Sequence, residues 1–354
     1  MNHNMPFELN EKLKSMEPYE PITGSFRIRL DANESFVPPA DEVMEDIKTA
    51  IENLHYIRYP DSAASELCAM AAVYYGVKPE LITAGNGSDD LISVIMNAFT
   101  QKGDKVLTFT PDFSMYSFYS SLTETVCIEM PKREDFTIDV DAAIKLANSE
   151  NVRLIIFSNP CNPTSVVLNA GDVKKLVGNV NALVVVDEAY MDFCGQSLVP
   201  EMESFDNLIV LRTMSKAMGM AAIRLGFSIA NQTITSAIRA AKSPYNVNSV
   251  SQAIGCAVFA HSEYIKHAIT RINASRDSLF AEMKRLQIEM PGKITAIAAD
   301  ANFVFTKADK AGELFEALMK AGIIVRRIGD YLRITAGRNL ENIEVVKAIE
   351  RFYK

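Results

Sequence analysis

The apolar positions of the chain fall into short runs that alternate with longer segments at helical spacing. Five short runs are rich in β-branched and other apolar residues, at 105–109, 153–158, 182–187, 207–212 and 224–230. Several of them are apolar at consecutive positions, which is typical of strands that helices cover on both faces. Residues 139–150 and 170–180 carry apolar side chains at helical spacing. The alternation predicts an α/β domain built on a mostly parallel sheet.

The C-terminal third has a different pattern. A long helical pattern covers residues 249–287, and the Pro and Gly of "MPGK" at 290–293 end it. The rest predicts strand, helix, strand, strand and helix, which is a small α+β unit. We therefore expect three parts. Residues 1–40 form an N-terminal arm that packs with the small domain, residues 41–245 form a large ligand-binding domain, and residues 246–354 form an interdomain helix followed by the small domain.

Composition and charge narrow the class of protein. The 354 residues are 48% hydrophobic, enough for one large core or two smaller ones. The net charge is −8 and there is no lysine-rich run, which argues against nucleic acid or an anionic membrane as a partner. No apolar run approaches the roughly 20 residues of a membrane span. The N-terminus lacks the apolar core of a signal peptide, so we expect a cytoplasmic protein.

The number and spacing of the cysteines and histidines argue against disulfide bonds and against a metal site. The five cysteines are odd in number and far apart, with no C-x-x-C, so we expect reduced thiols. The four histidines include one moderately close pair, His261 and His267, whose spacing is poor for two ligands on one helix. We expect no metal site.

Polar side chains follow two of the predicted strands. Asp187 ends the apolar run 183–186, and Tyr190 follows three residues later. Asn162 lies in "SNPCNPTS" (158–165), where the prolines push the backbone out of the helical region. Ligands of open parallel sheets bind at the carboxyl ends of the strands, which is where these residues would lie. Taken alone, an ordinary turn explains the Asp187 stretch equally well, and a plain turn is the favoured explanation of the Asn162 stretch.

A third stretch suits an anion. Gly85 and Gly87 lead into Ser88, Asp89 and an apolar helix. Glycines let backbone amides approach a ligand, and a helix N-terminus attracts phosphate. Neither the G-x-G-x-x-G nor the P-loop pattern is present. Simple capping of the helix by the same residues is the alternative.

The fourth stretch, "TMSKAMGMAAIRLG" (213–226), places Lys216 among small and apolar residues. A poorly hydrated amine is the better nucleophile. Ser215 beside it and Arg224 beyond it could both hold an anion. The alternative is a lysine whose ammonium group reaches the surface.

The four stretches have one common explanation. Pyridoxal phosphate requires a lysine for covalent attachment, an acid beside its ring nitrogen, donors for its ring oxygen and a phosphate cup. The residues that supply these are, in the same order, Lys216; Asp187; Asn162 and Tyr190; and Ser88, Asp89, Ser215 and Arg224.

Nine motifs carry a resemblance that runs nearly end to end. They are "EPY" (17–19), "LDANES" (30–35), "YPD" (59–61), "GNGSDD" (85–90), "PDF" (111–113), "NPT" (162–164), "DEAY" (187–190), "SKAMGMAAIRLG" (215–226) and "LRITAG" (332–337). With them the chain resembles the fold-type I pyridoxal-phosphate aminotransferases, in the histidinol-phosphate aminotransferase branch. The resemblance implies a large domain with a mostly parallel central sheet and a small α+β C-terminal domain.

The resemblance also implies residue roles. Lys216 would bind the cofactor and shuttle a proton, Asp187 would pair with the pyridinium nitrogen, and Phe113 would stack on the ring. Asn162 and Tyr190 would bond the ring oxygen. The phosphate would be held by Ser88, Asp89, Ser215 and Arg224, and by Tyr59 across a homodimer interface. Substrate recognition would fall to Tyr19, Asn33, Arg326 and Arg333, since arginine offers a planar fork to carboxylate or phosphate.

The implied reaction transfers the amino group of histidinol phosphate to 2-oxoglutarate. Threonine-phosphate decarboxylases share nearly all of these residues, and an imidazole pocket can accept the ring of an aromatic amino acid. A cofactor-binding protein without turnover is a more distant alternative. Two departures from the family pattern are Ser165, where the family has glycine after "NPT", and "SDD" at 88–90, where it has "ADE". Neither removes a cofactor ligand.

Overall fold

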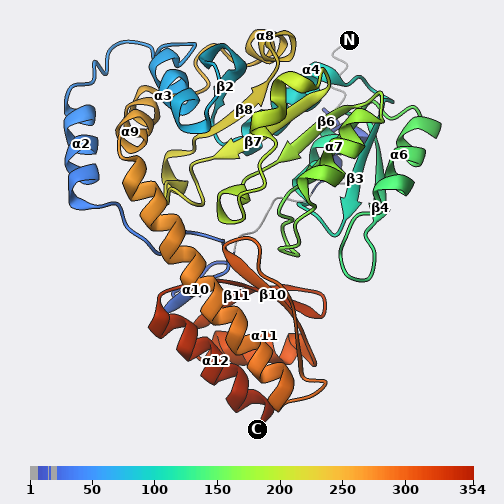
Figure 1. The fold of residues 1–354 in the computed structure, drawn as a ribbon, viewed down its shortest axis with the longest axis vertical. Coiled ribbons are helices and arrows are strands. Elements are labelled where there is room, and N and C mark those ends of the chain that lie inside the picture. The colour runs from blue at the N-terminus through green and yellow to red at the C-terminus, as the bar shows by residue number, and fades with distance from the viewer. Residues whose placement is uncertain (1–6, 15, 17–21) are drawn as a thin grey trace, which may run out of the picture.

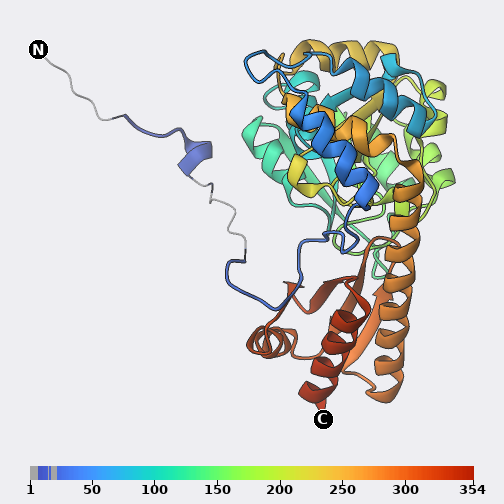
Figure 2. The same ribbon diagram turned by 90° about the vertical axis from the view of Figure 1, so that its left-hand side faces the viewer.

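The computed structural model describes residues 7–14, 16 and 22–354. Two sheets organise the chain, and the long helix α10 (Ser262–Glu289) runs from the larger sheet to the smaller one (Figures 1 and 2). The larger sheet has the order β2 (Ile82–Gly85), β8 (Gly226–Ala230), β7 (Leu208–Thr213), β6 (Leu183–Asp187), β5 (Leu154–Ser158), β3 (Lys105–Thr110) and β4 (Val126–Pro131).

Neighbouring strands of the larger sheet are parallel except at β8, which is antiparallel to both β2 and β7. Every residue of β5, β7 and β8 is buried, in keeping with their consecutive apolar side chains. The α/β prediction and its five strands are confirmed. The helices around this sheet are α2 (Asp41–Glu52), α3 (Ser65–Tyr75), α4 (Ser88–Phe99), α5 (Met115–Leu122), α6 (Val140–Ser149), α7 (Ala170–Gly178), α8 (Gln232–Ala241) and α9 (Ser249–Phe259).

The smaller sheet has the order β1 (Ile28–Leu30), β11 (Ile323–Ile328), β12 (Tyr331–Thr335), β10 (Phe303–Ala308) and β9 (Ile294–Ala298). Its strands pack with α10, α11 (Ala311–Lys320) and α12 (Asn339–Tyr353) around a second apolar cluster. Strand β1 pairs in parallel with β11, so the N-terminal segment joins the C-terminal sheet. The domain boundaries at 40 and 245 stay a prediction. The remaining helix, α1 (Glu11–Lys14), is a single turn.

The helical pattern predicted over 249–287 is confirmed, but it does not form one continuous helix. The structure has two helices, α9 and α10, which Ala260 and His261 separate. His261 has φ −111° and ψ 62°, which are not helical angles, and its Nε2 lies 2.7 Å from Asp46 Oδ2 on α2. This tertiary contact, across 215 positions of sequence, fixes the break. Among the helices of the described residues, none is both long and apolar enough to cross a membrane.

Candidate active site

Three adjacent parallel strands bring the predicted site residues together. In the register of the larger sheet Ser158 of β5 lies beside Asp187 of β6, which lies beside Leu211 of β7. The loops that follow these strands carry Asn162, Tyr190 and Lys216. All three therefore emerge at one edge of the sheet, where open α/β sheets bind their ligands.

Asp187 is a buried carboxylate with two donors. The Tyr116 hydroxyl donates to Oδ2 at 3.0 Å, and the backbone N–H of Ala189 donates to Oδ1 at 3.1 Å. Burial raises the pKa of Asp187 to about 6, although both hydrogen bonds act in the opposite direction. A cation placed against this carboxylate would offset the cost of burying its charge.

Lys216 and Tyr190 face the N-terminal segment that follows β1. Lys216 Nζ donates to the carbonyl oxygen of Ala32 at 3.1 Å and lies 5.6 Å from the centre of the Tyr190 ring. The Tyr190 hydroxyl accepts a hydrogen bond of 2.9 Å from Asn33 Nδ2. Asn33 is 1% exposed and has φ 55°, a backbone conformation that asparagine tolerates better than most residues. The lysine amine and the tyrosine ring thus border the same space.

A set of anion donors surrounds the start of α4. Strand β8 lies between β7 and β2, and the residues that precede it place Arg224 beside Gly87. Ser215, which follows β7, is buried, and its hydroxyl accepts a hydrogen bond of 3.1 Å from the Thr213 hydroxyl. Gly87 has φ 91°, and a Cβ there would lie 2.7 Å from Arg224 Nη2. A Cβ on Gly226 would lie 2.2 Å from the backbone nitrogen of Ser88. Only glycine leaves this cradle open, and its donors are helix N–H groups, a hydroxyl and a guanidinium, which together suit a phosphate.

One arginine of the smaller sheet contacts the loop that carries Asn162, and a second lies beside it. Arg333 Nη1 donates to Asn162 Oδ1, and its Nη2 donates to the carbonyl oxygen of Asp31. The Arg333 guanidinium lies 5.5 Å from the centre of the Phe303 ring. Arg326 sits directly across from Arg333 in the β11–β12 register. The smaller sheet therefore carries two cationic side chains on paired residues of neighbouring strands. One of them, Arg333, contacts the site.

The other predicted residues occupy varied environments. Phe113 is half-buried, with its ring in edge contact with Tyr116 at 5.6 Å. Asp89 is half-buried in the first turn of α4, and burial raises its pKa. Tyr59 is 80% exposed and stacks on Tyr245 with ring centres 4.5 Å apart. Tyr19 lies outside the described residues.

Two contributors were missed by sequence reasoning. Tyr116 bonds Asp187, and Phe303 lies between Tyr190 and Arg333, with its ring 5.4 Å from the tyrosine ring. The position of Tyr116, three residues after Phe113 at the start of α5, was an available signal. Phe303 had none, because its role depends on how the smaller sheet docks on the larger one.

Comparisons with known proteins agree with this geometry. Residues 27–352 match the family model for aminotransferase class I and II. The chain belongs to the class I and II aminotransferase family. It is 39% identical over 343 residues to the histidinol-phosphate aminotransferase of Clostridium novyi, covering 96% of this chain and 95% of that protein.

Solved aminotransferases share the fold. The histidinol-phosphate aminotransferase of Sinorhizobium meliloti in complex with pyridoxal-5'-phosphate superposes with a TM-score of 0.87 at 22% identity, covering 99% of both chains. The L-threonine-O-3-phosphate decarboxylase of Porphyromonas gingivalis gives 0.78 at 21% identity, covering 92% of this chain and 99% of the other. Likenesses at these identities establish the fold, and the fold alone does not distinguish the two reactions.

This aminotransferase is pyridoxal-phosphate dependent. The described residues fit that cofactor on their own chemistry. The buried carboxylate of Asp187 suits a cationic ring nitrogen, and the glycine-lined cradle beside Ser88 and Arg224 suits a phosphate. Lys216 supplies an amine in the same region.

Proposed function

We propose that this aminotransferase converts histidinol phosphate and 2-oxoglutarate to imidazole-acetol phosphate and glutamate, a reaction of histidine biosynthesis. The observation that carries the proposal is the match to histidinol-phosphate aminotransferases at 39% identity over nearly the whole chain. The paired positions of Arg326 and Arg333 suit it, because both the phosphate of one substrate and the carboxylate of the other need a cationic partner.

We propose that the site residues act as follows. Lys216 Nζ attaches the cofactor and is the atom at which a proton is held and moved. Asp187, with a hydrogen bond to each oxygen, holds the ring nitrogen in its protonated form. When bound, pyridoxal phosphate supplies an electron sink for the bond broken at the substrate Cα. Tyr190 and Asn162 bind the ring oxygen, and Phe113 covers the ring face.

The phosphate of the cofactor is assigned to the cradle of Ser88, Asp89, Ser215 and Arg224. The backbone N–H groups of the first turn of α4 and the Ser215 hydroxyl act as donors, while Arg224 adds charge. Substrate binding is assigned to Arg326 and Arg333, with Asn33 behind Tyr190 and Tyr19 from the N-terminal arm.

We further propose a homodimer in the cytoplasm. Tyr56, Ile57 and Tyr59 are all exposed large side chains within four residues, and Tyr245 extends this surface by stacking on Tyr59. A cluster of this kind suits a protein interface, and a partner's Tyr59 would reach the phosphate cradle. The five free cysteines suit a reducing compartment. Sedimentation of the loaded protein at the mass of one chain would contradict the dimer.

A half-reaction screen tests the proposed substrate. Cofactor-loaded protein is mixed with histidinol phosphate, threonine phosphate or phenylalanine, and the absorbance of the bound cofactor is followed. We expect rapid change with histidinol phosphate, and glutamate formation once 2-oxoglutarate is added. Carbon dioxide release from threonine phosphate would instead establish a decarboxylase. Faster change with phenylalanine would establish an aromatic aminotransferase, and no change with any amine would contradict turnover.

A further inference from the structure

A buried ion pair lies beside the proposed cofactor site, and none of the residue roles above uses it. Lys132 directly follows β4, and its Nζ lies 3.0 Å from Oδ2 of Asp112, which follows β3. Both side chains are 2% exposed. Burial lowers the pKa of Lys132, but Asp112 and Cys161 raise it by more, so the side chain remains an ammonium ion. Charges this deeply buried are found in proteins when they are paired.

The second oxygen of Asp112 binds the two loops that carry the proposed ring contacts. Oδ1 accepts hydrogen bonds from the backbone N–H of Phe113 at 2.8 Å, from the backbone N–H of Ser158 at 3.3 Å and from the Ser158 hydroxyl. The Ser158 hydroxyl oxygen in turn accepts the backbone N–H of Asn162 at 3.0 Å. One carboxylate thus fixes the backbone of Phe113 directly and that of Asn162 through Ser158.

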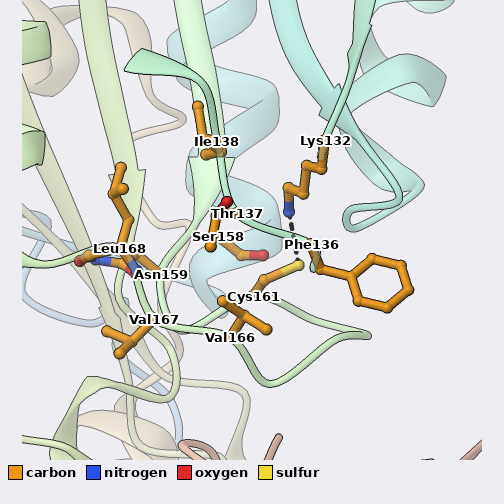
Figure 3. Close-up of a pocket in the computed structure, with 10 residues that line it drawn as sticks. All are labelled: Lys132, Phe136, Thr137, Ile138, Ser158, Asn159, Cys161, Val166, Val167 and Leu168. Carbon is orange, nitrogen blue, oxygen red and sulfur yellow. Dashed lines mark hydrogen bonds between the residues drawn. The ribbon is translucent and has the colours of Figure 1, made fainter. Parts of the chain in front are cut away.

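Figure 3 shows how Lys132 reaches this network. Its side chain extends toward Cys161, with Nζ 2.9 Å from Sγ, beside a cavity of about 20 Å³ that Ser158 also lines. Burial raises the pKa of the Cys161 thiol, which therefore stays neutral. The thiol is a weak polar neighbour, and the ion pair is with Asp112.

We propose that Lys132 is a positioning residue for the cofactor ring: by neutralising Asp112 it keeps the hydrogen bonds that fix Phe113 and Asn162. This inference rests on the proposed site, in which those two residues contact the ring. Without the ammonium, Asp112 is a buried charge with no counter-charge, and it is relieved only by taking up a proton or by moving toward water. Either change disturbs the three bonds at Oδ1.

The test measures cofactor affinity and the visible circular dichroism of the bound cofactor, which reports how the ring is held. Lys132→Met keeps a long apolar side chain and removes the charge. We expect it to weaken cofactor binding by about tenfold and to shrink the dichroic band. Asp112→Asn in the Lys132→Met background removes the buried charge and retains an acceptor oxygen, so both signals should recover. Cys161→Ser, which leaves the ion pair in place, should change neither.

Normal affinity and a normal band in Lys132→Met, or no recovery in the double variant, would overturn the inference. A merely structural lysine would lower the unfolding free energy and leave both signals of the folded protein intact. If Lys132→Met does not fold, two double variants are compared, in which Lys132→Met is combined with Asp112→Asn or with Asp112→Ala. Only the variant with alanine, which has no acceptor oxygen, should bind the cofactor more weakly. Equal cofactor affinities would contradict the proposal. Asn162→Ala tests the underlying site separately, because unchanged binding in that variant would reject the site itself.

Discussion

Asn33 Nδ2 donates a hydrogen bond of 2.9 Å to the hydroxyl oxygen of Tyr190, joining residues 157 positions apart. Asn33 follows β1 of the smaller sheet, and Tyr190 follows β6 of the larger one. Asn33 is held in turn by Thr335, whose hydroxyl bonds both its backbone N–H and its Oδ1 at 3.1 Å. The contact thus links the two sheets at the residue assigned to the cofactor's ring oxygen.

This contact predicts that Asn33 and Tyr190 act together on cofactor affinity. Asn33→Ala and Tyr190→Phe should each weaken cofactor binding, and the double variant should be less impaired than the sum of the two. The coupling should amount to about 1 kcal/mol, the net value of one buried hydrogen bond. Equilibrium titration of the four apoproteins with cofactor measures it. Strictly additive effects would show that the bond does not contribute to binding.

The raised pKa of Asp187 predicts a pH-dependent stability of the apoprotein. Burial raises the pKa from 3.8 in the unfolded chain to about 6 in the folded one, so the unfolded chain gives up this proton more readily. The contribution of Asp187 to the free energy of unfolding is therefore fully present below pH 4 and is lost as the pH rises through 6. The loss amounts to about 3 kcal/mol. Apoprotein carrying Asp187→Asn should gain that amount over wild type at pH 7 and little at pH 4. Denaturant unfolding at both values checks this, and an equal gain at both would contradict it.

Ser165 predicts a difference between two small substitutions. It has φ 62°, its hydroxyl accepts the Ala301 N–H at 2.8 Å, and the same hydroxyl donates to the Phe303 carbonyl at 3.3 Å. Ser165→Ala loses both bonds and keeps a strained backbone, which should lower the unfolding free energy by about 1–3 kcal/mol. Ser165→Gly loses the same bonds and relieves strain of about 1 kcal/mol. Urea unfolding should therefore find the glycine variant the more stable of the two, and the reverse order would contradict this account.

Substitution of two adjacent arginines should affect catalysis to very different extents. Arg326 lies across from Arg333, whereas Arg327, the next residue, points to the other face of β11 and is exposed. Arg326→Met should lower kcat/KM for histidinol phosphate by about tenfold to a hundredfold, the value of one charge-assisted contact. Arg327→Met should change it by less than about twofold, as is usual for an exposed charge. Steady-state kinetics of both variants decides, and equal effects would remove Arg326 from the substrate site.

The position of a strand in its sheet, interior or edge, explains which strands were predictable from the sequence. The five predicted strands of the larger sheet are β3, β5, β6, β7 and β8, all of which lie inside it. The four strands missed are β1, β2, β4 and β9, which form the edges of the two sheets. Edge strands have a neighbour on one side only, so their sequences need not be continuously apolar. β4, "VCIEMP", has no buried residue and shows no such run.

The candidate site was predictable where local motifs carry it. Asp187 ends a recognisable strand, Asn162 and Lys216 follow two others, and the sheet brings all three to one edge. Asp112 lies in the motif "PDF", but its pairing with Lys132 gave no signal, because a buried ion pair depends on which loops meet in three dimensions. The contact that splits α9 from α10 at His261 was hidden for the same reason.

The assignment of Lys216 as the attachment point of the cofactor is tested most directly by borohydride reduction of the loaded protein, followed by peptide mass spectrometry. The reduction makes the linkage permanent, so the modified peptide identifies the lysine. We predict the added cofactor mass on the peptide that contains Lys216, and its loss in Lys216→Ala. The cofactor on another lysine, or none fixed by reduction, would contradict the account.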